Sequence, residues 1–126
     1  MEATQAKYRG KKEYLLVYRE LINAAQYRGL ITYKEVAKII GVPLTGNLMG
    51  KEVGQVLGEI SEDEHAHGRP MLSALAVSSV TGQPGGGFLG LAKTLGLLQD
   101  DSPEGQAKFW KQTREKVYQT WERQLT

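Results

Sequence analysis

Residues 47–60 carry the sequence NLMGKEVGQVLGEI, which has a clear helical pattern. At 100° per residue, its apolar side chains fall on one side of a helix: Met49, Val53, Val56, Leu57 and Ile60. The other side carries polar residues and glycines: Asn47, Lys51, Gly54, Gln55 and Gly58. The pattern therefore predicts an amphipathic helix with its apolar side on the core and its polar side outwards.

A shorter helix is expected just before this one. Thr32 and Glu35 have the spacing of a capping box, so Thr32 is the predicted N-cap. Gly41 and Pro43 are residues that typically end a helix. Two helices joined by a tight turn describe a helix-turn-helix, in which the second helix enters the DNA groove. The outward side chains of residues 47–60 suit that role, since amides and ammonium groups bind base edges and phosphates.

Three glycines interrupt the predicted second helix at intervals of four residues: Gly50, Gly54 and Gly58. Each costs about 1 kcal/mol of helix stability relative to alanine. Three such costs on one stripe suggest that another molecule or element approaches the backbone closely. Two explanations stay open from the sequence. DNA could lie against the stripe, or another helix of the same protein could pack there.

The whole chain is expected to form one mostly helical α+β domain, residues 1–126. The fold is a winged-helix-like helix-turn-helix with a short strand pair and a long C-terminal helix. Its parts are a basic flexible N-terminus at 1–11, a core at 12–98 and the terminal helix at 102–126. Further elements are predicted as follows: helix 12–28, a short strand at 30–31, an acidic loop at 61–68, a strand at 71–79, a glycine-rich turn at 81–87 and a helix at 88–98. Ser102 and Pro103 open the last helix, whose Trp110 and Trp121 should pack onto the core.

Composition excludes several classes of protein. The chain has 126 residues, 40% hydrophobic and 24% charged, which is typical of a globular domain. It contains no cysteine, so disulfides, thiolate zinc sites and cysteine nucleophiles are excluded. It has no apolar run long enough for a membrane helix and no secretory signal, so we expect no membrane contact and a cytoplasmic location. The net charge of +2 permits phosphate binding without demanding it.

Three stretches resemble a known family: ITYKEVAKIIGVP, GKEVGQVLG and RPMLSALAVSSVTGQPGGGF. They are similar to the DNA-binding domain of alkylguanine-DNA alkyltransferases and alkyltransferase-like proteins, over about residues 30–98. The resemblance implies a winged-helix surface for duplex DNA, with Thr32 and Tyr33 opening the first helix. Met71 stands where the family has its reactive cysteine, so alkyl transfer is excluded. Lys51 stands at the family's arginine finger and, as a flexible point charge, is a poorer mimic of a base.

We therefore expect a non-catalytic protein that binds double-stranded DNA and has no cofactor, no catalytic residue and no metal site. The expected DNA-binding residues are Thr32, Tyr33, Asn47, Lys51, Gln55, Arg69 and Ser73. The alternative is a protein-interaction or regulatory adaptor, for example between host and phage, that uses the same helix.

A third class is a metal-dependent hydrolase built on the acidic segment. That segment offers Glu62, Asp63, Glu64, His65 and His67. Their spacing matches no strong pattern of metal ligands, and the ordinary role of such a segment is a solvated turn. Arg69 is expected to pair with Glu62 or Glu64.

Overall fold

The computed structural model describes residues 6–122. Its elements in chain order are α1 (Lys12–Gln26), β1 (Ile31–Thr32), α2 (Tyr33–Ile40), α3 (Gly46–Ala66), the 3-10 turn η1 (Leu72–Leu75), β2 (Ala76–Val77), α4 (Gly86–Thr94) and α5 (Pro103–Trp121). The two short strands pair in parallel, with Ile31 opposite Ala76 and Thr32 opposite Val77. The prediction of a mostly helical α+β domain is thus confirmed.

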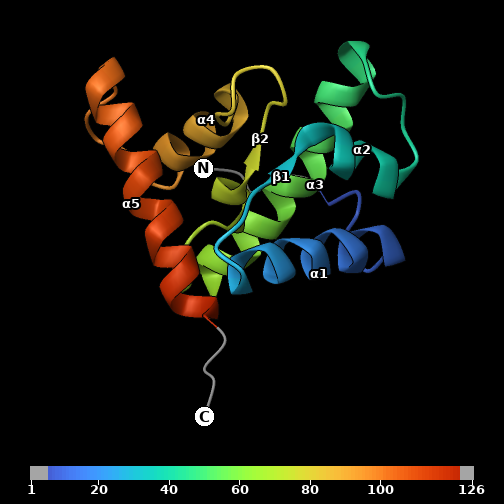
Figure 1. Cartoon of the computed structure of the whole chain (residues 1–126), viewed down its shortest axis with the longest axis horizontal. Coiled ribbons are helices and arrows are strands. Elements are labelled where there is room, and N and C mark those ends of the chain that lie inside the picture. Colours follow the sequence, from blue (N-terminus) through green and yellow to red (C-terminus); the bar gives the residue numbers. More distant parts are fainter. Residues whose placement is uncertain (1–5, 123–126) are drawn as a thin grey trace.

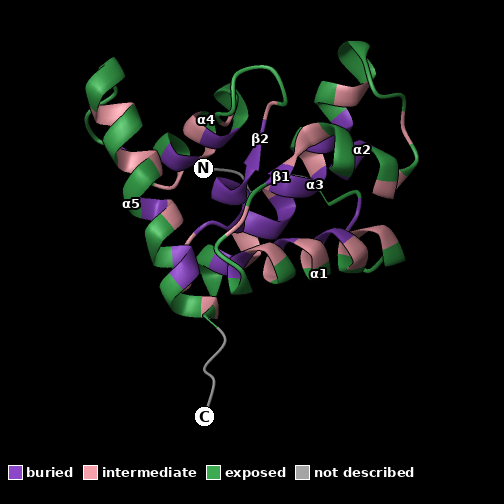
Figure 2. Cartoon of the chain, in the orientation of Figure 1, coloured by how far each residue is buried: buried purple, intermediate pink, exposed green. Residues whose placement is uncertain are grey.

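Helix α3 lies at the centre of the fold (Figure 1). It packs against α1, α2, η1 and α4, whereas α5 packs against η1 and α1. Figure 2 shows the buried residues concentrated where η1, β2 and α3 meet. All four residues of η1 are buried, which makes this turn the middle of the core.

Two of the predicted helix starts are confirmed by their caps. Thr32 Oγ1 accepts a hydrogen bond from the Glu35 N–H at 3.2 Å, and Gly41 ends α2 with φ +76°. Ser102 Oγ accepts from the Gly105 N–H at 3.1 Å at the start of α5. Trp110 and Trp121 both pack against the core as predicted, each half-buried.

The acidic loop predicted at 61–68 is wrong, because α3 continues to Ala66 and ends at His67. The apolar pattern stops at Ile60, but Ser61 and Glu64 are fully buried in the next turns. Their polar groups have partners inside the protein. The Glu64 carboxylate accepts hydrogen bonds from the Arg69 Nε at 2.8 Å and the Tyr18 hydroxyl at 3.1 Å.

The strand predicted at 71–79 is also wrong over most of its length. Residues 72–75 form η1, and only Ala76 and Val77 pair with β1. Residues 71–77 are buried without exception, so the segment fills the core on every side and does not alternate as a half-buried strand does. Helix α4 spans Gly86–Thr94 and not 88–98, and α1 ends at Gln26.

The N-terminal segment was predicted to be flexible, but residues 7–9 are fixed on α3. The backbone N–H groups of Lys7, Tyr8 and Arg9 all donate to the Glu59 carboxylate, at 2.8–3.1 Å. Burial, followed by the hydrogen bond to Glu52, raises the pKa of Tyr8 to about 12, so its hydroxyl remains a donor. We call residues 7–9 the N-terminal arm; residues 1–5 lie outside the described chain. The arm covers the side of α3 that carries Glu52 and Glu59.

Candidate nucleic-acid interface

The glycine stripe of α3 has open space beside each of its three glycines within residues 6–122. A Cβ atom built on Gly50, Gly54 or Gly58 would meet no neighbouring heavy atom within 4 Å. Gly50 and Gly54 are exposed, and Gly58 is half-buried. Packing of another helix of this chain was one of two explanations for the stripe. Within residues 6–122, α4 packs on α3 but leaves open space beside the three glycines, so another molecule can approach them.

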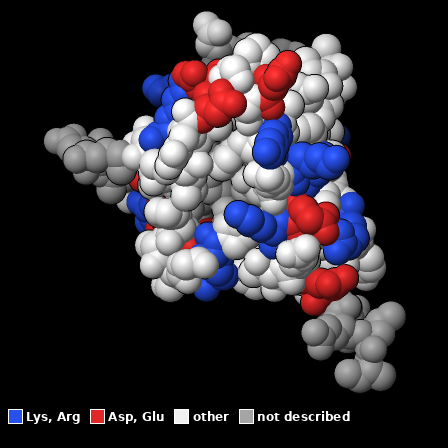
Figure 3. Space-filling model, turned by 90° about the vertical axis from the view of Figure 1, so that its left-hand side faces the viewer, with Lys and Arg blue, Asp and Glu red and all other residues white. Residues whose placement is uncertain are grey.

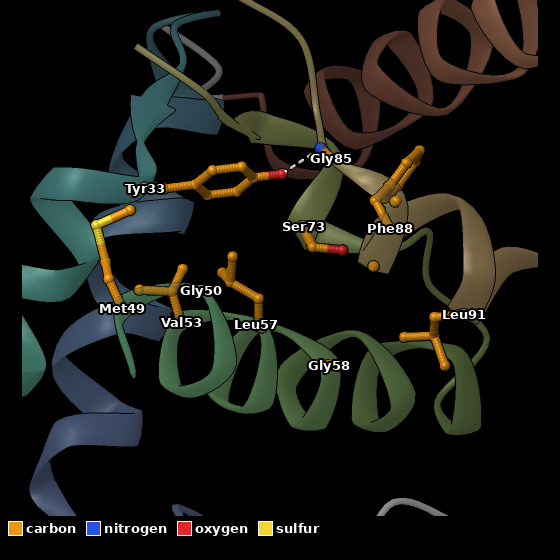
Figure 4. Close-up of a pocket in the computed structure, with 13 residues that line it drawn as sticks. Tyr33, Met49, Gly50, Val53, Leu57, Gly58, Ser73, Gly85, Phe88 and Leu91 are labelled. Atoms are coloured by element: carbon orange, nitrogen blue, oxygen red, sulfur yellow. Dashed lines mark hydrogen bonds between the residues drawn. The ribbon is translucent and has the colours of Figure 1, made fainter. Parts of the chain in front are cut away.

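The stripe forms one wall of a cavity of about 250 Å³, which we call the α3 cavity. The facing wall is the start of α4, where three further glycines lie at 85–87. The side chains that line it are mostly apolar: Tyr33, Met49, Val53, Leu57, Ser73, Phe88 and Leu91. Figure 4 shows Val53 and Leu57 rising from α3 towards the Tyr33 ring, with Phe88 and Leu91 on the α4 side.

Tyr33 joins the two walls of the α3 cavity. It is the first residue of α2, and its hydroxyl oxygen accepts a hydrogen bond from the Gly85 N–H at 2.6 Å (Figure 4). Burial raises the pKa of Tyr33, and the hydrogen bond from Gly85 only partly opposes this. The phenol therefore stays protonated, and its hydrogen can be donated to a group that enters the cavity.

Ser73 lies in the wall of the cavity and not on the protein surface. It is buried, its hydroxyl oxygen accepts from Ser61 Oγ at 2.7 Å, and its backbone N–H donates back to Ser61 Oγ at 3.0 Å. Ser73 was expected to contact duplex DNA, and its burial rules out contact with a duplex backbone. A group inside the cavity could still reach it.

The outward side of α3 carries two of the predicted residues. Asn47 and Lys51 are exposed in the first two turns of the helix, next to the glycine stripe. Gln55 behaves differently. Its Nε2 donates to Glu59 Oε2 at 2.8 Å, so it supports the anchor of the N-terminal arm. The helical period placed Gln55 on the correct side but did not reveal this partner.

Arg69 does not join Asn47 and Lys51 at one surface. Arg69 follows the C-terminal end of α3, pairs with Glu64 as predicted, and lies 5.6 Å over the Trp121 ring. A 21-residue helix is about 30 Å long, so Arg69 is far from Asn47. The Thr32 side chain is engaged as the cap of α2.

The carboxylates of the acidic segment are bound to groups of the protein itself. Arg9 pairs with Asp63 at 3.0 Å and with Glu62 at 3.5 Å, and the Tyr14 hydroxyl donates to Asp63. His65 and His67 are exposed. Among residues 6–122, no three histidine or acidic side chains are grouped to hold a metal ion. The segment therefore serves to fix the N-terminal arm and Arg69.

Sequence reasoning missed the second wall of the cavity and the N-terminal arm. The sequence does contain a signal for the second wall. The three consecutive glycines at the end of TGQPGGG, residues 85–87, lie across the cavity from the glycines of α3.

Comparison with protein-family models, with curated proteins and with solved structures finds no match to this chain. Within residues 6–122, no helix has the length and apolar character needed to cross a membrane.

Proposed function

We propose that this chain is a non-catalytic DNA-binding protein that docks on duplex DNA with the exposed side of α3 and takes one unstacked base into the α3 cavity. The observation that carries the proposal is the uncovered glycine stripe with an apolar cavity directly beside it. The resemblance to alkyltransferase-like proteins supports the same surface.

A helix without side chains on one stripe can approach DNA closely. The major groove of B-DNA is about 12 Å wide and admits an α-helix. Lys51 and Asn47 flank the stripe and supply an ammonium group and an amide for phosphates or base edges. The loop at 78–85 would take the place of a wing. It is held by hydrogen bonds such as Ser78 N–H to the Gln83 carbonyl at 3.0 Å.

The α3 cavity suits a planar, partly polar group such as a nucleobase. Its walls are apolar, and the Tyr33 ring offers a face on which a base could stack, an interaction worth about 1–3 kcal/mol. The Tyr33 hydroxyl and Ser73 are the polar groups within reach of a base edge. Because Lys51 is not a planar wedge, the protein should favour a base that is already weakly paired, such as a mismatched or damaged one.

The surroundings of the cavity support binding without chemistry. Met71, at the place of the family's cysteine, is fully buried in the core. Ser73 is hydrogen-bonded to Ser61, and none of the described residues that line the cavity is a histidine or a carboxylate that could act as a base. These residues do not form an activated nucleophile.

Fluorescence anisotropy with three labelled duplexes tests the proposal: one fully matched, one with a G·T mismatch and one with O6-methylguanine. We expect salt-dependent binding, with a preference for the mismatched duplex and for the duplex that contains O6-methylguanine. Tyr33→Phe should reduce the preference and leave binding to matched DNA unchanged. Lys51→Ala should lower the salt slope by about one for every duplex. Absence of wild-type binding at about 50 mM salt, where phosphate contacts are strong, would refute the DNA proposal.

A protein partner is the second candidate. Leu44 and Leu48 are 37% and 50% exposed beside the first turn of α3 and would be the apolar contacts of such a partner. If the wild-type protein binds no duplex, substitution of Leu48 by Ser in a partner-capture assay would test the adaptor function.

A further inference from the structure

A second groove lies on the other side of the segment that closes the α3 cavity. It has a volume of about 370 Å³ and runs between α5 and residues 83–89, and we call it the α5 groove. Gln83, Pro84 and Leu89 form one wall, while Gly85 and Phe88 of the same segment line the α3 cavity. The two hollows therefore share one wall, and a molecule bound at the cavity would pass close to the groove.

The floor of the α5 groove is a cation–π pair from α5. The Arg114 guanidinium lies 4.4 Å from the centre of the Trp110 ring. The ring itself is fixed, because Trp110 Nε1 donates to the Ala74 carbonyl at 2.8 Å. A guanidinium in contact with an aromatic face through its cation–π interaction still has its N–H donors for bidentate contact with a phosphate. Arg114 is thus held in a geometry suited to an anion.

The lining of the groove is positive. Lys111 and Arg114 both line it, and none of its other described lining residues is a carboxylate. Neither forms an ion pair within residues 6–122, whereas Lys93 nearby pairs with Asp101 at 2.7 Å. Figure 3 shows acidic and basic side chains interspersed over the rest of this side of the molecule. The groove is thus a local site where two cations have no counter-ion among the described residues.

We propose that the α5 groove binds phosphates of the same DNA duplex that docks on α3, so that Lys111 and Arg114 extend the contact along the backbone. The inference rests on the proposed function and adds a second contact surface outside the helix-turn-helix. Charge complementarity and the shared wall at residues 83–89 both support a nucleic-acid backbone as the occupant.

The test compares two double variants with equal loss of charge. Lys111→Gln with Arg114→Gln removes the cations of the groove. Lys108→Gln with Lys116→Gln removes two exposed cations of the same helix that do not line it. Anisotropy with a matched duplex of about 20 base pairs, from about 50 to 300 mM salt, gives affinity and salt slope. Thermal melting checks that each variant folds.

We expect the groove variant to lose about two units of salt slope and about 10- to 60-fold in affinity near 0.1 M salt, as for two phosphate contacts. The control variant should lose much less. Equal effects of the two variants would overturn the inference while leaving the proposed function intact, and the groove would then be open to an acidic protein segment instead. If the wild-type protein does not bind the duplex, both this inference and the proposed function are overturned. If the groove variant melts early, Lys111→Gln alone against Lys108→Gln alone gives the same comparison with one unit of slope.

Discussion

Alanine in place of the three glycines of the α3 stripe should raise the stability of the fold and weaken the binding of DNA. Replacing Gly50, Gly54 and Gly58 together by alanine should stabilise the fold, because none of the new Cβ atoms would meet a neighbour within 4 Å. None of the three has a positive φ, since all lie inside α3. Alanine is therefore compatible with the backbone at each position.

The size of the effect follows from helix propensity. Glycine in a helix interior is about 0.5–1 kcal/mol less favourable than alanine, so the triple variant should gain about 1.5–3 kcal/mol of unfolding free energy. For a domain of this size that corresponds to a rise in Tm of roughly 5–15 °C. Urea unfolding and thermal melting by circular dichroism would measure both quantities.

Binding of DNA should fall in the same variant. Three methyl groups would keep the duplex away from the α3 backbone and would narrow the α3 cavity, so we expect at least about tenfold weaker binding, or 1.4 kcal/mol. Gly90→Ala is the matched control. Gly90 is an exposed helical glycine of α4 with no neighbour within 4 Å, and it does not line the cavity. It should gain stability with no change in binding.

Two results would refute this reasoning. A destabilised triple variant would mean that the stripe is packed in the working protein. A stabilised variant that binds duplex DNA as well as the wild type would mean that close approach to the α3 backbone has no part in binding.

Three further predictions concern the supports of the site. Burial favours a raised pKa for Glu59, but hydrogen bonds from Gln55 and from the backbone of residues 7–9 outweigh it and hold the pKa below 4.5. The ionised Glu59 therefore contributes stability above pH 4.5, and this contribution is lost as the pH falls below that value. In urea unfolding measured at several pH values, Glu59→Gln should lose less stability than the wild type as the pH is lowered. An equal loss in both proteins would contradict this. Trp110→Phe leaves the buried Ala74 carbonyl without its donor and should cost about 1–3 kcal/mol in urea unfolding; no loss would show that water replaces the indole. Added Zn²⁺, Mn²⁺ or Mg²⁺ should not raise the Tm, because the carboxylates at 62–64 already have partners; a rise of several degrees at micromolar metal would revive the metal-dependent hydrolase.

The parts of the fold that the sequence predicts well are those fixed by local interactions. The caps at Thr32 and Ser102 lie within three residues of the groups they bind, so their pattern is visible in the chain itself. The last turns of α3 are different. Glu64 is fully buried there, and it accepts hydrogen bonds from Tyr18, which lies 46 residues away, as well as from the nearby Arg69. A buried carboxylate has the same letter in the sequence as a solvated one, so the sequence pattern predicts an end of this helix that is too early.

The same distinction applies to the candidate site. The helical period alone places Lys51 and Asn47 outwards, and the structure exposes both. It cannot show that Gln55 is held by Glu59, or that Ser73 is held by Ser61 in the wall of a cavity. The α3 cavity itself exists only because residues 85–87 fold back opposite α3, and no local pattern fixes that approach.

The N-terminal arm neutralises two carboxylates of α3 that lie beside its exposed side. The side of α3 next to the exposed one carries Glu52 and Glu59, both buried, and carboxylates beside a DNA-binding surface would repel phosphates. Lys7 pairs with Glu52, and three backbone N–H groups of residues 7–9 surround the Glu59 carboxylate. The arm thus offsets two negative charges within the protein. The exposed side of α3 then presents Lys51 as its charged group, which is the electrostatic condition that the proposed docking on DNA requires.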